Sequence, residues 1–237
     1  MATGFHFQFT TKDAKKLLFV LLLFEMCLVL IFALDTSVVE MPLSIHKLFD
    51  LDEESTVPTW FSSAQLFLIG ILFLFSPQWP QRHRIVTPGF LLLVGIGFIF
   101  LSMDETATFH EKVTGVLKPV EWMPRFKGNH GIWIPVYFSI AVVLVIIGSR
   151  TIYSMFKAYP RQVIIIFSGL TVLLIGVVVM EIISYYYLRG TESTLLYKAE
   201  VALEEFFEMA GASIVLYGTI LCALQNPELQ NTTAATE

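Results

Sequence analysis

Carboxyl and imidazole side chains stand at the margins of several strongly apolar segments of this chain. Ionisable groups at such margins are costly to bury unless they face the protein interior and find partners. Carboxylates combined with an imidazole are ligands that suit a hard or borderline divalent ion. The residues with this placement are Asp35, Asp104, Glu105, His110, Glu111, Glu181, Glu204, Glu205 and Glu208.

Two short motifs have the most informative spacing. Asp104 and Glu111 are seven residues apart, so they share one face if a single helix runs through both. Glu204 and Glu208 are four residues apart, and like charges at this spacing repel unless a cation or a proton lies between them. We therefore predict a divalent-metal site for Fe, Mn, Zn or Ca, with the ligands Asp104, His110, Glu111, Glu204 and Glu208.

Other ionisable residues receive supporting roles in this prediction. His110 is the side chain best suited to proton transfer near neutral pH if it is not itself a ligand. Glu105 and Glu205 are expected to orient ligands or to move protons, so these three residues are the predicted catalytic groups. Asp35 and Glu181 are expected to support the site from a second layer or to belong to a path leading to it.

Glu25 differs from these residues because it lies well inside an apolar segment, at a depth of roughly 12 Å by helix rise. Two interpretations stay open. A protonated carboxyl could hydrogen-bond a neighbouring helix, or Glu25 could be a step in a proton or cation path.

Known metal signatures are absent from the sequence. Cys27 and Cys222 both fall inside apolar segments and form no CxxC motif, which excludes a thiolate site. Carboxylate-bridged di-metal bundles use Glu-x-x-His pairs, whereas Glu105 and His110 are five residues apart. This spacing weakens a di-iron interpretation.

The composition is that of a membrane protein. Of 237 residues, 55% are hydrophobic and 15% are charged, and the mean hydropathy is +0.70. A soluble domain of this length could not bury so much apolar surface, so membrane lipids are the expected surroundings. The net charge is −5 and no basic run is present, so no nucleic-acid partner is predicted.

Long apolar segments predict an all-α fold, an integral membrane bundle of six transmembrane helices. We expect one transmembrane helical domain over residues 1–225 and a flexible polar tail over 226–237. The two longer loops have room for short interfacial helices. The predicted spans are 17–34, 60–76, 88–103, 132–149, 162–187 and 203–224.

Basic residues set the predicted orientation. Lys and Arg occur before the first span and in the short loops after the second and fourth spans, so this side should be cytoplasmic and both termini should lie there. The other loops, at 35–59 and 103–131, are acidic. We expect the site to face the periplasmic or outer side, and the inner membrane of a bacterium is the expected location.

Counting depth along the helices brings the acidic residues into one layer. At about 1.5 Å per residue, the acidic residues of four spans lie roughly 24–30 Å from the inner ends of those spans. The matched depth predicts that the carboxyl groups converge near the outer margin of the hydrocarbon. The residues counted in this way are Asp35, Asp104, Glu181, Glu204 and Glu208.

Three motifs carry a resemblance to other proteins. They are L-D-E-E at 51–54 running to P-T-W-F-S-S at 58–63, L-S-M-D-E at 101–105 running to H-E-K at 110–112, and L-E-E at 203–205 running to E-M-A-G at 208–211. Together they resemble a family of uncharacterised bacterial multipass membrane proteins. This resemblance covers most of the chain and implies a six-span fold without implying an activity.

Three functions are compatible with the sequence. The first is a metal-dependent enzyme acting on a lipid or another amphiphile near the outer leaflet. The second is a divalent cation channel or transporter, in which the acidic layer collects cations and Glu25 continues the path. The third is an accessory subunit that binds a membrane-protein partner, for example through residues 112–131.

Overall fold

The structure, a computed structural model, describes residues 9–37, 41–78, 88–126, 130–188, 190–191 and 194–224. Within these residues the chain is helical and contains no strand, which confirms the predicted all-α class. Six helices are long and apolar enough to cross a membrane, so the chain is an integral multipass membrane protein. Several basic loop residues and the predicted tail over 226–237 lie outside the described residues.

The observed helices extend beyond several predicted span ends. The last helix begins eight residues before the predicted start at 203, because backbone hydrogen bonding continues through the polar residues that precede the apolar run. Acidic residues that were expected to open this span therefore lie within its first four turns. The spans are α1 (Thr11–Ser37), α3 (Val57–Leu74), α4 (Pro88–Ala107), α6 (Trp133–Ala158), the segment from α7 (Pro160–Leu174) to Leu188, and α9 (Leu195–Leu224).

Short helices occupy the two longer loops, as expected. Helix α2 (Leu43–Phe49) follows α1, and α5 (Phe109–Leu117) follows α4. Thr108 separates α4 from α5 because its backbone is left-handed, with φ of 51°. We call this end of the bundle, which carries both short helices, the α2–α5 end.

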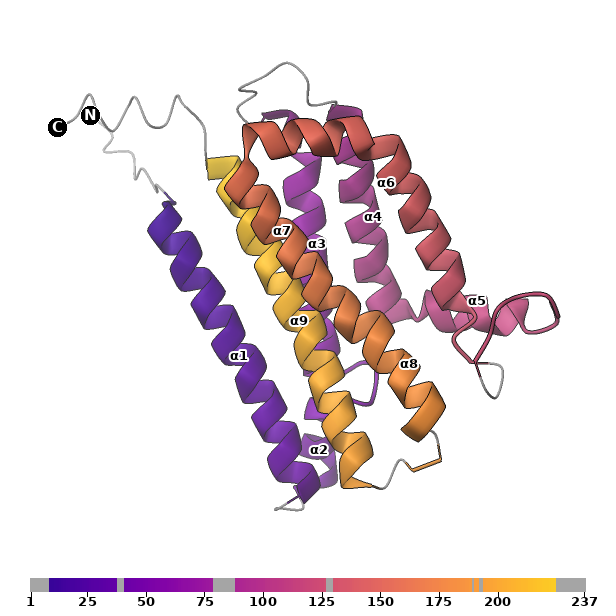
Figure 1. Cartoon of the computed structure of the whole chain (residues 1–237). Coiled ribbons are helices and arrows are strands. Elements are labelled where there is room, and N and C mark those ends of the chain that lie inside the picture. Colours follow the sequence, from indigo (N-terminus) through magenta and orange to yellow (C-terminus); the bar gives the residue numbers. More distant parts are fainter. Residues whose placement is uncertain are drawn as a thin grey trace.

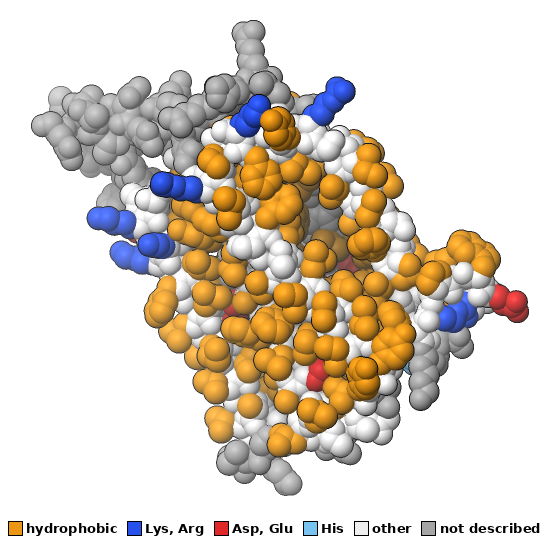
Figure 2. Space-filling view, in the orientation of Figure 1, with side chains coloured by type: hydrophobic (Ala, Val, Ile, Leu, Met, Phe, Trp, Pro, Cys, Tyr) orange, Lys and Arg blue, Asp and Glu red, His pale blue; other side chains and the backbone are white. Residues whose placement is uncertain are grey.

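Helix α9 lies at the centre of the bundle (Figure 1) and packs against α1, α3 and α7. Helix α3 also packs against α4, whereas α6 lies at the periphery. Helix α1 begins and α9 ends at the same end of the bundle, opposite the α2–α5 end. Lys and Arg side chains gather there, and most of the remaining visible surface is hydrophobic (Figure 2).

Glycines allow the central helices to pack backbone to backbone. A Cβ atom on Gly169 of α7 would lie 2.8 Å from the carbonyl oxygen of Gly211 on α9. A Cβ atom on Gly211 would collide with the backbone of Leu173. Small residues at such an interface let transmembrane helices approach closely, which fixes the position of α9 against α7.

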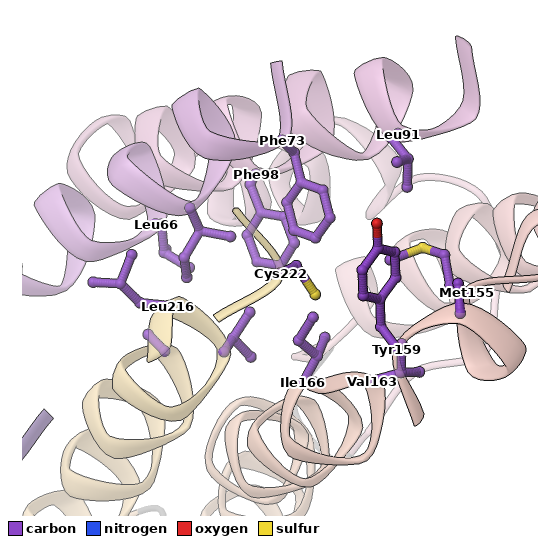
Figure 3. Close-up of a cluster of buried hydrophobic side chains, with 14 residues drawn as sticks. Leu66, Phe73, Leu91, Phe98, Met155, Tyr159, Val163, Ile166, Leu216 and Cys222 are labelled. Carbon is purple, nitrogen blue, oxygen red and sulfur yellow. The ribbon is translucent and has the colours of Figure 1, made fainter. Parts of the chain in front are cut away.

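An apolar core lies in the half of the bundle away from the α2–α5 end, and Figure 3 shows its side chains. Side chains from α3, α4, α6, α7 and α9 meet there, including Phe73, Phe98, Tyr159, Ile166 and Cys222. None of the described residues in this core carries a carboxyl or a basic group. The buried carboxyl groups of Glu25, Asp104 and Glu200 therefore lie outside this core.

The fifth span changes its helical geometry twice. Residues Ile175–Met180 and Ser184–Leu188 are π-helical, and they flank the short helix α8 (Glu181–Ile183). π-helical turns are rare and occur frequently at functional sites. Glu181 therefore stands between two irregular stretches that face α9.

Candidate functional site

Asp104 and His110 form a pair at the α2–α5 end. The left-handed turn at Thr108 folds α5 back toward the end of α4. The backbone N–H of His110 donates to Asp104 Oδ1 at 2.8 Å, and His110 Nδ1 lies 3.2 Å from the same oxygen. Asp104 is 6% exposed. The buried carboxylate therefore caps the first turn of α5 and also fixes the orientation of the imidazole.

The pKa of His110 is raised above its ordinary value. Burial acts to lower this pKa, but the hydrogen bond to Asp104 and the negative charges of Asp104, Glu111 and Glu105 outweigh the effect of burial. The imidazole therefore holds its proton to a higher pH than a free histidine does. A histidine in this state can both donate and accept a proton near neutral pH.

Aromatic rings enclose one side of this pair. Trp133 meets the His110 ring edge to face, with 5.4 Å between ring centroids, and also contacts Tyr137. The Tyr137 hydroxyl lies beside Asp104. The indole N–H of Trp133 is buried and meets no hydrogen-bond acceptor among the described residues. It is therefore available to an oxygen of a bound molecule.

Glu105 connects this pair to the rest of the bundle. Its Oε1 accepts a hydrogen bond of 2.5 Å from the Ser62 hydroxyl on α3. Asp104 and His110 interact with Glu105 electrostatically from one side, and Glu205 and Glu208 of α9 do so from the other. Glu105 thus links the two predicted halves of the site, although it was expected only as a supporting residue.

Three glutamates form a stripe along α9, which we call the α9 acidic stripe: Glu200, Glu204 and Glu208. The spacing of four residues places them on one helix face. Glu204 and Glu208 both interact electrostatically with Glu181 across the interface with the fifth span. No ion pair with Lys or Arg involves the stripe in the part of the chain that the structure describes.

Glu200 is the most buried member of the α9 acidic stripe. It is only 5% exposed, and neither carboxyl oxygen makes a hydrogen bond of ordinary geometry to a described residue. Glu204 and Ser184 are its polar neighbours. A carboxyl group in this position must be neutral or must be matched by a bound cation, because an uncompensated buried charge is strongly destabilising.

Glu25 makes a separate polar contact in the middle of the bundle. Gln65 on α3 and Ser213 on α9 both donate to its Oε1, at 2.9 Å and 2.6 Å. This contact joins the first, second and sixth spans. Hydrogen bonds between Glu25 and neighbouring helices are therefore present in the structure, while the protonation of Glu25 and the path interpretation stay predictions.

Asp35 finds a different partner from the one expected. It contacts His46 of α2, and His46 also lies 3.4 Å from Asp50. The pKa of His46 is raised, first by the hydrogen bond to Asp35 and then, against the effect of burial, by the charges of Asp35 and Asp50. Asp35 therefore ties α1 to α2 and is not among the electrostatic neighbours of the α9 acidic stripe.

The five predicted metal ligands do not form one ready-made site. The helix does not run from Asp104 to Glu111, so these residues do not share a helix face, and Glu111 is exposed on α5. Across the residues that the structure describes, no group of three or more His, Cys, Asp or Glu side chains has the arrangement of a metal site. Glu204 and Glu208 lie together, whereas Asp104 and His110 form their own pair.

Sequence reasoning missed several residues of this region. Glu200 was overlooked because it precedes the apolar run, although its spacing of four from Glu204 was a signal. Ser62 and Gln65 were overlooked because neutral polar residues inside apolar segments attract little attention. Trp133 and Tyr137 follow a loop, and no local pattern connects them to His110.

Comparison with other proteins identifies a family but no activity. Residues 18–224 match the family described as Domain of unknown function (DUF8692). The chain matches no protein with a curated description and no solved structure. The match covers most of the first span and all of the other five, and it implies no activity.

Proposed function

The chain belongs to the DUF8692 family, and we propose that it is a membrane-embedded enzyme that acts on a lipid or another amphiphile by general acid–base catalysis. The Asp104–His110 pair would be its acid–base group. The observation that carries this proposal is the double contact of His110 with the buried Asp104 carboxylate. Glu105 and Glu205 would be further proton-transfer groups beside it.

An oriented imidazole is the usual group for general acid–base catalysis. Asp104 fixes Nδ1, so Nε2 is the nitrogen that would exchange a proton with a substrate. The buried Trp133 N–H lies next to the imidazole and could donate to a substrate oxygen. A fixed proton donor beside a fixed N–H donor favours chemistry at an oxygen-bearing group.

The surroundings favour a substrate from the membrane. The pair lies where the long apolar helix α4 ends and α5 begins, which in a bilayer would be near the level where lipid headgroups meet the hydrocarbon. Helix α6 is peripheral, and apolar side chains such as Phe138, Val142 and Ile146 are exposed on it. An amphiphile could therefore approach laterally, with its polar group toward His110 and its chains in the bilayer.

A divalent ion is a further part of the proposal. Asp104, His110, Glu111, Glu204 and Glu208 would be its ligands, and Fe, Mn, Zn or Ca the candidate ions. Support comes from the isolated carboxyl groups of the α9 acidic stripe, which have no basic partner among the described residues. The exposed position of Glu111 and the separation of the ligands into two groups count against this set.

Lipid analysis would test the acid–base proposal. Purified protein in nanodiscs of phosphatidylethanolamine and phosphatidylglycerol is incubated with Mn, Fe, Zn or Ca or with a chelator, and the lipids are followed by mass spectrometry. We expect turnover that falls by about 10²-fold or more in His110→Ala. His46→Gln is the matched control, because His46 also pairs with a carboxylate but lies outside the site. Full activity of His110→Ala would overturn the proposal, as would unchanged lipids under every condition.

The metal is tested separately by elemental analysis of the wild type beside Glu208→Ala. Bound metal that is lost in the variant supports the divalent ion. If the wild type contains no bound metal, the divalent ion is excluded from the proposal. The acid–base role of Asp104 and His110 is then tested by lipid turnover alone. The cytoplasmic position of the termini and the inner-membrane location belong to the same proposal.

A divalent cation channel or transporter is the second candidate. The observation that favours it is Glu25, which carries a carboxyl group to the middle of the membrane beneath Glu205 and Glu208. The apolar core of the other half of the bundle counts against a continuous path (Figure 3). An accessory subunit is a third candidate, for which the 80% exposed Trp122 would be a contact with a membrane-protein partner.

A further inference from the structure

Three polar side chains from three helices meet in the middle of the membrane domain. Glu25 of α1 is 0% exposed, Gln65 of α3 is 2% exposed and Ser213 of α9 is 0% exposed. Glu25 is near the centre of its 27-residue helix. These groups are therefore shielded from water and lipid alike, and their hydrogen bonds must be satisfied within the protein.

The hydrogen bonds at this point leave two oxygens without a donor. Glu25 Oε1 accepts from the Gln65 amide at 2.9 Å and from the Ser213 hydroxyl at 2.6 Å. The same Gln65 amide nitrogen also donates to Ser213 Oγ at 2.8 Å and to the Met209 carbonyl at 3.4 Å. Glu25 Oε2 and Gln65 Oε1 are buried and accept no hydrogen bond from a described residue. Both unsatisfied atoms are acceptors.

The surrounding helices supply no positive charge. Helix α3 contains no charged residue, and on α1 the nearest charged neighbours of Glu25 are Lys16 and Asp35, nine and ten positions away in sequence. On α9 the charged residue nearest to Ser213 is Glu208. A carboxylate buried without compensation is strongly disfavoured. The site therefore requires one positive charge that the protein itself does not provide.

We propose that Glu25, Gln65, Ser213 and the Met209 carbonyl bind one exchangeable monovalent cation, a sodium ion or a proton. All four groups offer oxygen atoms, which are the ligands that hard cations prefer. A sodium ion would be held by the two unsatisfied oxygens together with Ser213 Oγ and the Met209 carbonyl oxygen, whereas a proton would reside on Glu25 Oε2. This site does not depend on the proposed enzyme activity.

Exchange would take place from the α2–α5 end. Ser62, which donates to Glu105, precedes Gln65 by three residues, or roughly 4.5 Å of helix rise. Glu208 precedes Ser213 by five residues, or roughly 7.5 Å of helix rise. On the other side, Leu66 and Leu216 (Figure 3) begin the apolar core, together with Ile69. The bound cation would therefore be occluded from one side and reached through the carboxyl groups on the other.

Infrared difference spectroscopy would test this site on the full-length protein in liposomes. The carbonyl band of protonated carboxyl groups is followed between about pH 5 and pH 10, with either sodium or N-methylglucamine as the cation. Glu25→Gln identifies the contribution of Glu25, and Glu54→Gln, at an exposed loop position, is the matched control. Ser213→Ala, which removes one ligand and should fold, provides a second test.

If the bound cation is a proton, we expect a carbonyl band that disappears as pH rises. This band should not change when sodium is added, and it should be missing in Glu25→Gln. If the bound cation is sodium, we expect added sodium to remove this band at constant pH. Sodium should also raise the melting temperature of the wild type but not of Glu25→Gln. Ser213→Ala should then need about tenfold more sodium for the same effect. A band that is insensitive to pH and sodium, or no band and no sodium effect, would overturn the proposal.

Discussion

Gly176 of the fifth span lies directly against Glu208 of α9: a Cβ atom built on this glycine would come within 2.7 Å of Glu208 Cγ and 3.0 Å of Glu208 N. The same Cβ atom would lie 2.8 Å from the Glu204 carbonyl oxygen. Gly176 is part of the π-helical stretch Ile175–Met180. The irregular helix and the missing side chain therefore set the position of the α9 acidic stripe.

Gly176→Ala should displace α9 from the fifth span. Overpacking of a close contact costs typically about 1–3 kcal/mol, so we expect a lower melting temperature in detergent. Gly97→Ala on α4 is the matched control, because nothing lies within 4 Å of the Cβ atom that it adds. Equal melting temperatures for both variants would show that the approach of Gly176 to Glu208 is not tight.

The titration of His110 should depend on Asp104. Because its folded-state pKa is raised, the stabilisation from this pair is complete below the ordinary histidine pKa of about 6.5 and is lost as pH rises through the raised value. In Asp104→Asn the pKa of His110 should fall, since the Asp104 carboxylate is the group that raises it most. NMR of imidazole-labelled protein measures this shift directly. An unchanged titration in Asp104→Asn would contradict the pairing.

His46 should give a second pH-dependent contribution, at the contact between α1 and α2. Its folded-state pKa is also raised, so its ion pairs with Asp35 and Asp50 stabilise the fold at low pH and lose that effect as pH rises through the raised value. Melting temperatures measured against pH should show this loss in the wild type. His46→Gln should lack it, while retaining the change that His110 causes. A profile that does not change in His46→Gln would exclude this role.

More of the fold than of the site could be predicted from the sequence. Apolar runs reveal spans because lipid requires continuous helices, and all six were found. The turn at Thr108 could not be predicted, since threonine carries no local signal for a left-handed backbone. Because the helix is interrupted at Thr108, Asp104 and Glu111 do not share one helix face as predicted. The close pairing of Asp104 with His110 results from the same turn.

Contacts between helices are the second feature that could not be predicted from the sequence. The sequence identified Glu25 as unusual from its depth alone. Its partners Gln65 and Ser213 lie 40 and 188 residues away along the chain, so no spacing rule connects them. Ser62 and Glu105 are likewise 43 residues apart. Polar contacts of this kind depend on which helices are neighbours, and hydropathy does not determine that.

The orientation can be tested at two exposed positions. Trp122 lies in the loop that precedes α6, and Lys157 lies near the last residue of α6, so the two positions are on opposite sides of this span. In a background with Cys27 and Cys222 replaced by alanine, we expect a membrane-impermeant maleimide to label Trp122→Cys in intact cells. Lys157→Cys should react only after the cells are opened. Labelling of Lys157→Cys from outside would place the termini on the outer side.

Proteoliposomes containing the pure protein should show no cation flux above empty liposomes. Conduction needs polar groups along the whole membrane thickness, whereas the core beyond Glu25 consists of side chains such as Ile69, Phe73 and Ile166. Binding of a monovalent cation at Glu25 is compatible with this result, because a site open to one side binds without conducting. Flux of Na, Ca or Mn, measured with ion-sensitive dyes, would reveal a path. Flux that is abolished by Glu25→Gln and also by Glu208→Gln would show that the protein is a transporter and would reject the enzyme proposal.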